Sequence, residues 1–171
     1  MKYSDFKKVF VGLAVLSIMS ATPTQQAYGQ AAKANSTQEL TPKRNENSGK
    51  EGYVNKAGKL VIPYKFDKVE PFSDGFATVC IGSKWGVIDK KGTEIISCLY
   101  QKIKHMKAPS GLAGFSVTLD GKMSFFDITG RQTVPFEYSG FAILEEDGGL
   151  VGMYQGKWVR INKDGQREDN N

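Results

Sequence analysis

The chain has few of the side chains from which metal centres and nucleophilic catalysts are built. Among its 171 residues there is one histidine, His105, and there are two cysteines, Cys80 and Cys98. A zinc site or a histidine-based triad would need a second His or a Cys close to His105, and the cysteines do not have a metal-ligand spacing. The sequence therefore predicts no catalytic residue, no metal site and no cofactor, and it places His105 in a solvated loop.

No apolar run in the sequence reaches the length of about 20 residues that a membrane-spanning helix needs. The run at residues 9–19 follows a lysine-rich start and precedes small residues, which is the order found in secretory signal peptides. Residues 1–29 are therefore predicted to direct export and to be cleaved near residues 29–31. No cysteine lies near the cut, which excludes a lipoprotein anchor. We expect the mature chain in the periplasm, at the cell surface or outside the cell, without a transmembrane segment.

A strong charge of one sign is also absent. Residues 1–29 hold three Lys and one Asp, so their removal from a chain with 23 basic and 18 acidic side chains leaves a net charge of +3. These charges are spread along the chain, a distribution that does not favour nucleic-acid binding. Export would bring Cys80 and Cys98 into an oxidising compartment, and the pattern leaves open whether they form a disulfide or remain buried thiols.

The sequence does contain an internal repeat. Residues 84–92, KWGVIDKKG, have three counterparts with Lys first, Asp or Asn sixth and Gly ninth, at residues 50–58, 122–130 and 157–165. The ninth-position glycines, Gly58, Gly92, Gly130 and Gly165, are 34, 38 and 35 residues apart. A period in this range is typical of stacked supersecondary units. The repeat domain is therefore assigned to residues 50–165, with units at 50–83, 84–121 and 122–156 and a partial unit at 157–165.

Each unit has the pattern of a β-hairpin. The residue before the Asp or Asn is large and apolar in every copy, and the residue two positions earlier is small or apolar, which is typical of a strand with one buried face. The Asp or Asn favours a type I turn, and the Gly supplies the positive φ of a bulge. We expect the returning strand to end at Pro63 in the first unit and at Pro135 in the third, because proline cannot donate to the ladder.

The predicted fold class is all-β, an antiparallel hairpin repeat array with a period of about 35 residues and three strands per repeat. The pattern leaves open whether the array stays open like a solenoid or closes like a propeller or barrel. Outside the repeats the composition is polar. Residues 30–49 are expected to form a disordered linker and residues 166–171 a frayed tail.

Residues 72–79 (FSDGFATV), 82–92 (GSKWGVIDKKG) and 95–96 (II) resemble the WG, or KWG, repeat family of bacterial proteins. The likeness covers roughly residues 50–165. The Trp-Gly pair itself is intact only in the second unit and becomes Glu51-Gly52, Met123-Ser124 and Trp158-Val159 in the others. The resemblance implies an all-β repeat array, often exported, with no enzymatic activity and no catalytic residues to carry over.

The candidate contact surface is aromatic, and its members are Tyr53, Trp85, Phe125 and Trp158. They lie on the strand face opposite the constant apolar position, and corresponding positions of stacked units line up along one face. An aromatic row would stack on sugars or anchor a protein. The alternative is that the rings cover small residues of neighbouring strands and serve packing alone.

Three further candidates are groups of charged residues. The lysines of residues 102–107 could grip an anionic glycan or a phospholipid head group, or form a solvated sheet edge. Glu145, Glu146 and Asp147 lack the alternating spacing of a calcium loop, so an exposed acidic loop is expected. A glycosidase pair would require suitable separations among the scattered carboxylates, which are Asp67, Glu70, Asp74 and Glu94.

Together these features predict an exported, non-enzymatic binding or interaction module. Its partner is expected to be a protein or a glycan at the cell envelope. One alternative is a structural, envelope-associated protein without a ligand site. The other is a secreted hydrolase, which would need two carboxylates or a nucleophile and a base to converge in one pocket.

Overall fold

The computed structural model describes residues 39–168, which belong to one compact unit. In this stretch the chain forms fifteen β-strands in four antiparallel sheets and no helix, so the predicted all-β hairpin array is confirmed. None of the described residues forms a helix that could cross a bilayer. The predicted signal peptide, residues 1–29, lies outside the described residues.

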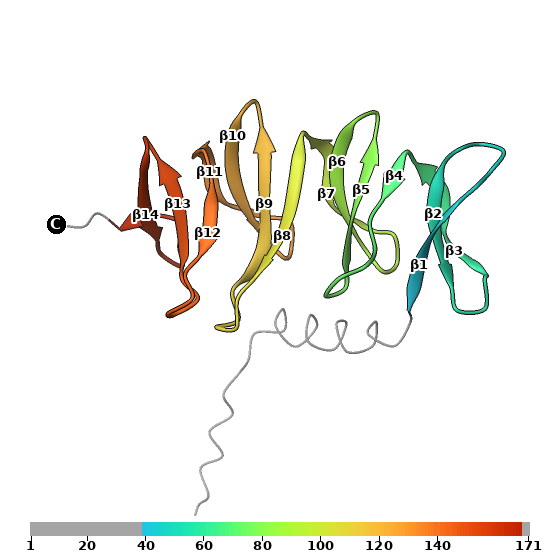
Figure 1. Ribbon diagram of the computed structural model, residues 1–171, viewed down its shortest axis with the longest axis horizontal. Helices are drawn as coiled ribbons and strands as arrows, with labels where there is room; N and C mark the ends of the chain where they lie inside the picture. Colours follow the sequence, from blue (N-terminus) through green and yellow to red (C-terminus); the bar gives the residue numbers. More distant parts are fainter. Residues whose placement is uncertain (1–38, 169–171) are drawn as a thin grey trace, which may run out of the picture. The chain divides into compact units, whose positions relative to one another are not determined.

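The four sheets follow one another in chain order (Figure 1). The first sheet consists of β1 (Leu40–Arg44), β2 (Glu51–Asn55) and β3 (Leu60–Phe66). The second consists of β4 (Lys68–Val69), β5 (Phe76–Ile81), β6 (Lys84–Asp89) and β7 (Glu94–Tyr100). The third consists of β8 (Lys102–Lys107), β9 (Ala113–Leu119), β10 (Lys122–Asp127) and β11 (Gln132–Tyr138). The fourth consists of β12 (Phe141–Ile143), β13 (Leu150–Tyr154), β14 (Lys157–Ile161) and β15 (Arg167–Glu168).

The second, third and fourth sheets contain a strand that the sequence analysis did not predict, namely β4, β8 or β12. The unit therefore contributes four strands rather than three. β4 and β12 have only two and three residues, too few to show a period. β8 pairs with β9 over all six of its residues, although its lysines give it the composition of a loop.

Both ends of the repeat domain are more ordered than predicted. Leu40–Arg44 was assigned to the disordered linker, residues 30–49, yet it forms β1 and pairs residue by residue with β2. The buried side chain of Leu40 joins the first core cluster, and this burial helps to offset the entropy of ordering a polar segment. Arg167–Glu168 was assigned to the frayed tail, residues 166–171, yet it forms β15 against β14. The two assignments were wrong for these residues.

The outer strand of each complete hairpin is bulged. Between the pairs Tyr53↔Ile62 and Glu51↔Phe66, a step of two residues along β2 corresponds to a step of four along β3. The same shift occurs between β6 and β7 and between β10 and β11. Because a bulge interrupts the ladder, it can hold a proline, which has no N–H to donate. β3 and β11 therefore continue past Pro63 and Pro135, and the prediction that the prolines end these strands was wrong.

The bulge also explains the small residue at the third position of the unit. A Cβ on Gly86 would lie 2.5 Å from the carbonyl oxygen of Ile96, which leaves almost no room for a side chain. The third sheet has Ser124 at this position, and its buried hydroxyl donates a hydrogen bond to the corresponding carbonyl, that of Val134. At this position a serine therefore binds, through its hydroxyl, the carbonyl that the glycine of the second sheet lies against.

The turns have the predicted geometry. Gly58, Gly92, Gly130 and Gly165 all have positive φ, between 76° and 84°. In the second unit, Asp89 Oδ1 accepts hydrogen bonds from the backbone N–H groups of Lys91 and Thr93, both at 2.8 Å. The acid at the sixth position thus satisfies the backbone of its own turn.

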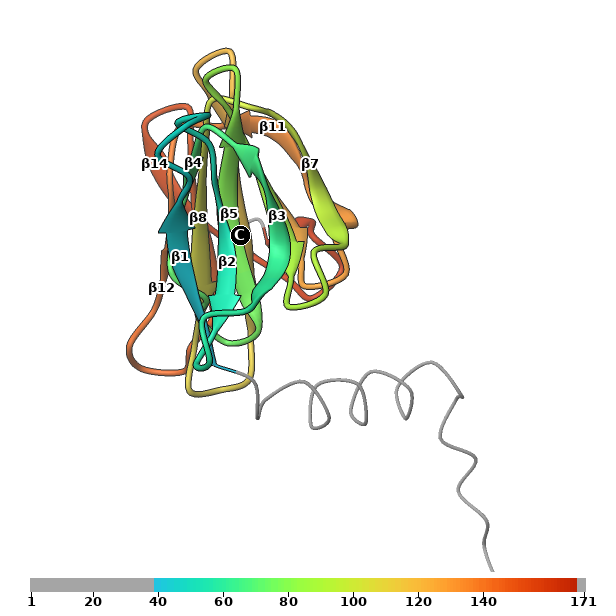
Figure 2. The ribbon, with the colours of Figure 1, turned by 90° about the vertical axis from the view of Figure 1, so that its right-hand side faces the viewer.

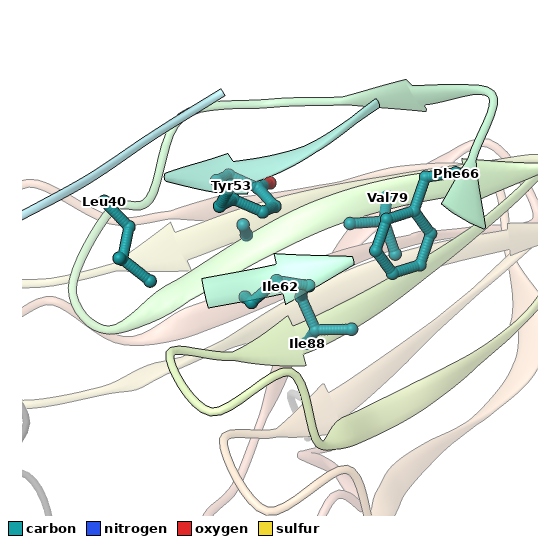
Figure 3. Packing of buried hydrophobic residues seen from close by; sticks show 7 residues of the cluster. Leu40, Tyr53, Ile62, Phe66, Val79 and Ile88 are labelled. Carbon is teal, nitrogen blue, oxygen red and sulfur yellow. The ribbon is translucent and has the colours of Figure 1, made fainter. Parts of the chain in front are cut away.

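The hydrophobic core lies between successive sheets, as three clusters that join the first sheet to the second, the second to the third and the third to the fourth. Figure 3 shows the first cluster, in which the residues that meet are Leu40, Tyr53, Ile62, Phe66, Val79 and Ile88. The predicted buried position is confirmed at Ile88. The sequence pattern indicated one buried face, but the opposite face of the inner strands is also core, because Tyr53 and Val87 are fully buried.

Candidate functional site

The predicted aromatic row does not form one accessible surface. Tyr53 and Phe125 are only 0 % and 3 % exposed, because the fourth position of a unit faces the core between its own sheet and the next. The Tyr53 hydroxyl donates to the backbone carbonyl of Glu70 at 2.6 Å. The prediction of Tyr53 and Phe125 as partner contacts was therefore wrong, and packing accounts for both rings.

Trp85 and Trp158 occupy the second position of their units. Trp85 is partly buried and stands opposite Tyr100 of β7. Trp158 is 52 % exposed. β15 pairs with β14 only at Arg160 and Ile161, so no residue of β15 stands opposite Trp158. Of the four predicted contact residues, only Trp158 has a largely exposed ring.

The outer face of the fourth sheet carries ion pairs instead of an apolar core residue. Arg160 takes the position that an apolar core residue holds in the other units, and its Nη1 lies 2.6 Å from Asp147 Oδ2. Its Nε lies 4.0 Å from Glu168 Oε2. The acidic loop at residues 145–147 thus provides an ion-pair partner. Within residues 39–168, no three His, Cys, Asp or Glu side chains are grouped so that they could hold a metal ion.

A groove lies between the second and third sheets. Its lining residues follow β4 and belong to β5, β8 and β9, and Figure 2 shows β4 and β8 on the same side of the stack. β4 ends at Val69 after two paired residues. The chain still follows β5 beyond this point, because the N–H of Glu70 donates to the carbonyl of Thr78 at 3.0 Å and Ser73 forms a β-bridge with Phe76. The groove has a volume of about 250 Å³. We call it the β5–β8 groove, and the residues that define it are Glu70, Ser73, Phe76, Thr78, His105 and Phe115.

Three rings form the floor of the β5–β8 groove. The ring centroids of Phe76 and Phe115 are 5.5 Å apart at an interplanar angle of 87°, and that of His105 is 5.2 Å from Phe115 at 33°. Burial lowers the pKa of His105, although the Asp74 carboxylate partly opposes this, so the imidazole is neutral at pH 7. His105 lies within β8, opposite Phe115, and its predicted position in a loop was wrong.

The rim of the groove carries charges of both signs. The Thr78 hydroxyl donates to the Glu70 carboxylate. Lys102 and Lys104 line the opposite side, and neither takes part in any ion pair between described residues. The groove therefore combines an apolar floor with free hydrogen-bond donors and a positioned acceptor.

A second cavity, of about 320 Å³, lies between the third and fourth sheets. Leu112, Phe125 and Leu150 contribute apolar walls, and Asp127 and Arg131 lie among its lining residues. The Nε of Arg131 donates to Asp127 Oδ2 at 3.2 Å. The one carboxylate that lines this cavity is therefore already bound.

The carboxylates considered as a glycosidase pair do not converge on one cavity. A hydrogen bond from Lys50 lowers the pKa of Asp67, and one from Lys107 lowers that of Asp74. Glu70 is the only one of the four that lines either cavity. Neither cavity in the described part of the chain offers a substrate the two carboxylates of a glycosidase.

Sequence reasoning missed Phe76, Ser73 and Phe115 as site residues. Phe76 and Phe115 lie on corresponding strands but not at corresponding positions, since Phe76 pairs with Asp89 and Phe115 with Phe126. A usable signal was present in β8, where the less polar Ile103 and His105 alternate with lysines. That alternation indicates an edge strand with one covered face.

The comparisons with known proteins agree with the repeat pattern. A family model described as "WG containing repeat" matches residues 52–85 and 85–122. These stretches run from β2 into β6 and from β6 to the start of β10, so the family's unit spans two sheets. No curated protein matches the chain, and no solved structure matches it. The chain therefore contains two WG repeats, which together span residues 52–122.

Proposed function

We propose that the protein is an exported, non-enzymatic interaction module that binds a protein or glycan partner of the cell envelope. The observation that carries the proposal is the β5–β8 groove, with its apolar floor, its positioned Glu70 carboxylate and the two lysines at its rim, Lys102 and Lys104. Binding sites are commonly concave and apolar, with a few polar groups that fix the orientation of the ligand. The signal-peptide pattern of residues 1–29 supports export.

The chemistry of the groove favours binding over catalysis. Asp74 does not orient His105 through a hydrogen bond, because His105 Nδ1 is 3.9 Å from Asp74 Oδ2, which is beyond hydrogen-bonding distance. Glu70 already accepts a hydrogen bond from Thr78. A carboxylic general acid at neutral pH needs a raised pKa. The pKa of Asp74 is instead lowered, chiefly by the hydrogen bond from Lys107.

The test is the capture of envelope material by the purified protein and by two variants. Glu70→Gln alters the groove. Glu94→Gln is the matched control, because Glu94 also accepts a hydrogen bond from a hydroxyl, that of Ser97, but does not line the groove. We expect the wild type and Glu94→Gln to capture the same partner and Glu70→Gln to capture much less.

Equal capture by all three proteins would remove the groove from the binding surface and contradict the proposal. Co-sedimentation of all three with cell-wall material, with no captured partner, would instead favour the structural envelope protein.

A further inference from the structure

We infer that the β5–β8 groove holds a single pyranose ring of an envelope glycan. This inference rests on the proposed function and names the class of ligand for the same groove. The volume of about 250 Å³ lies just below the range of about 300–1,000 Å³ that is usual for drug-sized ligands. The groove therefore has room for one sugar ring rather than for an extended chain.

A pyranose has two kinds of surface, and the groove offers a partner for each. The C–H groups of the sugar ring form an apolar face, which can lie on the partly exposed ring of Phe76, itself packed edge-on against Phe115. The sugar hydroxyls surround that face, and each can donate and accept. Glu70 is the acceptor, because an ionised carboxylate has about four lone-pair sites and Thr78 uses one of them. Ser73 lies at the same rim as a donor.

The groups that would contact the sugar are already held in place. The hydrogen bond from Thr78 holds the Glu70 carboxylate, and the His105 ring packs on Phe115 with 5.2 Å between their centroids. The Asp74 carboxylate, which lies 3.9 Å from His105 Nδ1, is itself held by an ion pair with Lys107. Such preorganised groups lose little conformational freedom when a ligand binds, so a small groove can still give measurable affinity.

A protein partner fits the groove less well. A stable protein interface buries about 1,200–2,000 Å² of surface, far more than a cavity for one ring can provide. A peptide could instead add a strand to the outer edge of β8. The lysines of this strand, Lys102, Lys104 and Lys107, oppose such pairing, because charged side chains on edge strands discourage strand addition.

The test is a titration of the ¹⁵N-labelled protein with three trisaccharides and one control anion. The trisaccharides are chitotriose, cellotriose and trigalacturonate, which are N-acetylated, neutral and acidic, and the control is inorganic phosphate. Each ligand is added up to about 10 mM, which approaches saturation of a site whose Kd is about 1 mM. We expect at least one trisaccharide to shift the amide signals of Phe76, Thr78, Ile103 and His105.

The two glutamate variants then assign the hydrogen bonds. Loss of a charge-assisted hydrogen bond should weaken binding about tenfold in Glu70→Gln, while Glu94→Gln should bind like the wild type. Shifts that persist unchanged in Glu70→Gln would overturn the assigned contact. Equal shifts with phosphate would show that the lysines attract any anion. This result would contradict the inference that the groove binds a pyranose ring.

The titration separates failure of this inference from failure of the proposed function. If no trisaccharide shifts the groove amides while capture of envelope material still depends on Glu70, the ligand is not a pyranose and the interaction module stands. Protease sensitivity of the captured material would then identify a protein partner. If the amides do not shift and capture does not depend on Glu70, both are overturned.

Discussion

The turn glycine Gly130 packs against the carbonyl oxygen of Ile95 in the preceding sheet, so closely that a Cβ on the glycine would overlap that oxygen. Gly165 lies in the same way against the carbonyl of Thr133. Gly58, in the first sheet, has no atom within 4 Å of the place where its Cβ would be. The ninth-position glycine therefore supplies positive φ in every unit, but in the third and fourth units it also lets the turn approach the sheet before it.

Replacing two of these glycines by alanine should separate the two roles. Gly58→Ala and Gly130→Ala both place a Cβ at positive φ, which costs roughly 1–2 kcal/mol. Gly130→Ala also forces the turn away from Ile95, and overpacking of this kind adds about 1–3 kcal/mol. Equilibrium urea unfolding should therefore show a clearly larger loss for Gly130→Ala. Equal losses would mean that the turn does not pack on the preceding sheet.

Ile88 tests the core between the first and second sheets. Its side chain is 2 % exposed and packs in the first cluster. Ile88→Ala should lower the free energy of unfolding by about 2–5 kcal/mol, because it removes buried methyl groups and leaves a cavity. The control is Leu99→Ala, since Leu99 is 61 % exposed and its loss should change stability by less than about 0.5 kcal/mol. A loss below that value for Ile88→Ala would show that this face is not core.

Ser124 occupies in the third sheet the position that Gly86 occupies in the second. It therefore indicates that serine is the replacement for Gly86 that costs least. Gly86→Ala and Gly86→Ser both place a Cβ against the carbonyl of Ile96, so both should destabilise the protein. Serine can also donate to that carbonyl, as Ser124 does to Val134, and such a hydrogen bond contributes about 0.5–1.5 kcal/mol. Thermal melting should therefore rank Gly86→Ser above Gly86→Ala. The reverse order would mean that the bulges of the second and third sheets differ.

The turns and inner strands could be predicted from the sequence because they depend on neighbours in the chain. Asp89 and Gly92 form one turn, and their pattern is complete within four residues. Whether a strand face is covered depends instead on the next sheet, about 35 residues away. Nothing in the alternation around Tyr53 shows that the second sheet covers its ring, so the predicted aromatic row included a core residue.

The groove could not be predicted for a related reason. It is lined by the segment that follows the short strand β4, which includes Glu70 and Ser73, and by β8, which includes His105. A strand of two residues shows no periodicity, and the lysines of β8 concealed its alternation. The intact Trp-Gly pair at Trp85 and Gly86 identified the family, but Trp85 does not line the groove. The residues that reveal the repeat are therefore not those that form the candidate site.

The sheet itself separates Cys80 from Cys98. Cys98 packs with Val79 in the first core cluster, and Cys80 follows Val79 in β5, so its side chain points to the opposite face. Both are free thiols. Alkylation after unfolding without reductant should modify two cysteines, as measured by mass. In the native protein the reaction should be slow, because Cys80 is buried and burial raises the pKa of the Cys98 thiol. Alkylation that requires prior reduction would reveal a disulfide.

The titration of His105 should make the stability depend on pH below neutrality. Burial lowers the pKa of His105 from its ordinary value of 6.5, and Asp74 only partly opposes this. Below about pH 6.5 the unfolded chain therefore binds a proton that the folded chain does not, so stability falls as the pH decreases towards the folded pKa. At about pH 8 the imidazole is neutral in both states and contributes nothing.

His105→Gln removes this titration and should flatten the pH dependence. Urea unfolding at about pH 7.5 and about pH 5.5 should show a larger loss of stability for the wild type than for His105→Gln. Asp74 does not interfere in this range, because the hydrogen bond from Lys107 lowers its pKa below 3.8, and its own contribution is lost only at lower pH. Parallel losses in the two proteins would show that His105 keeps an ordinary pKa and that the floor of the groove is open to water.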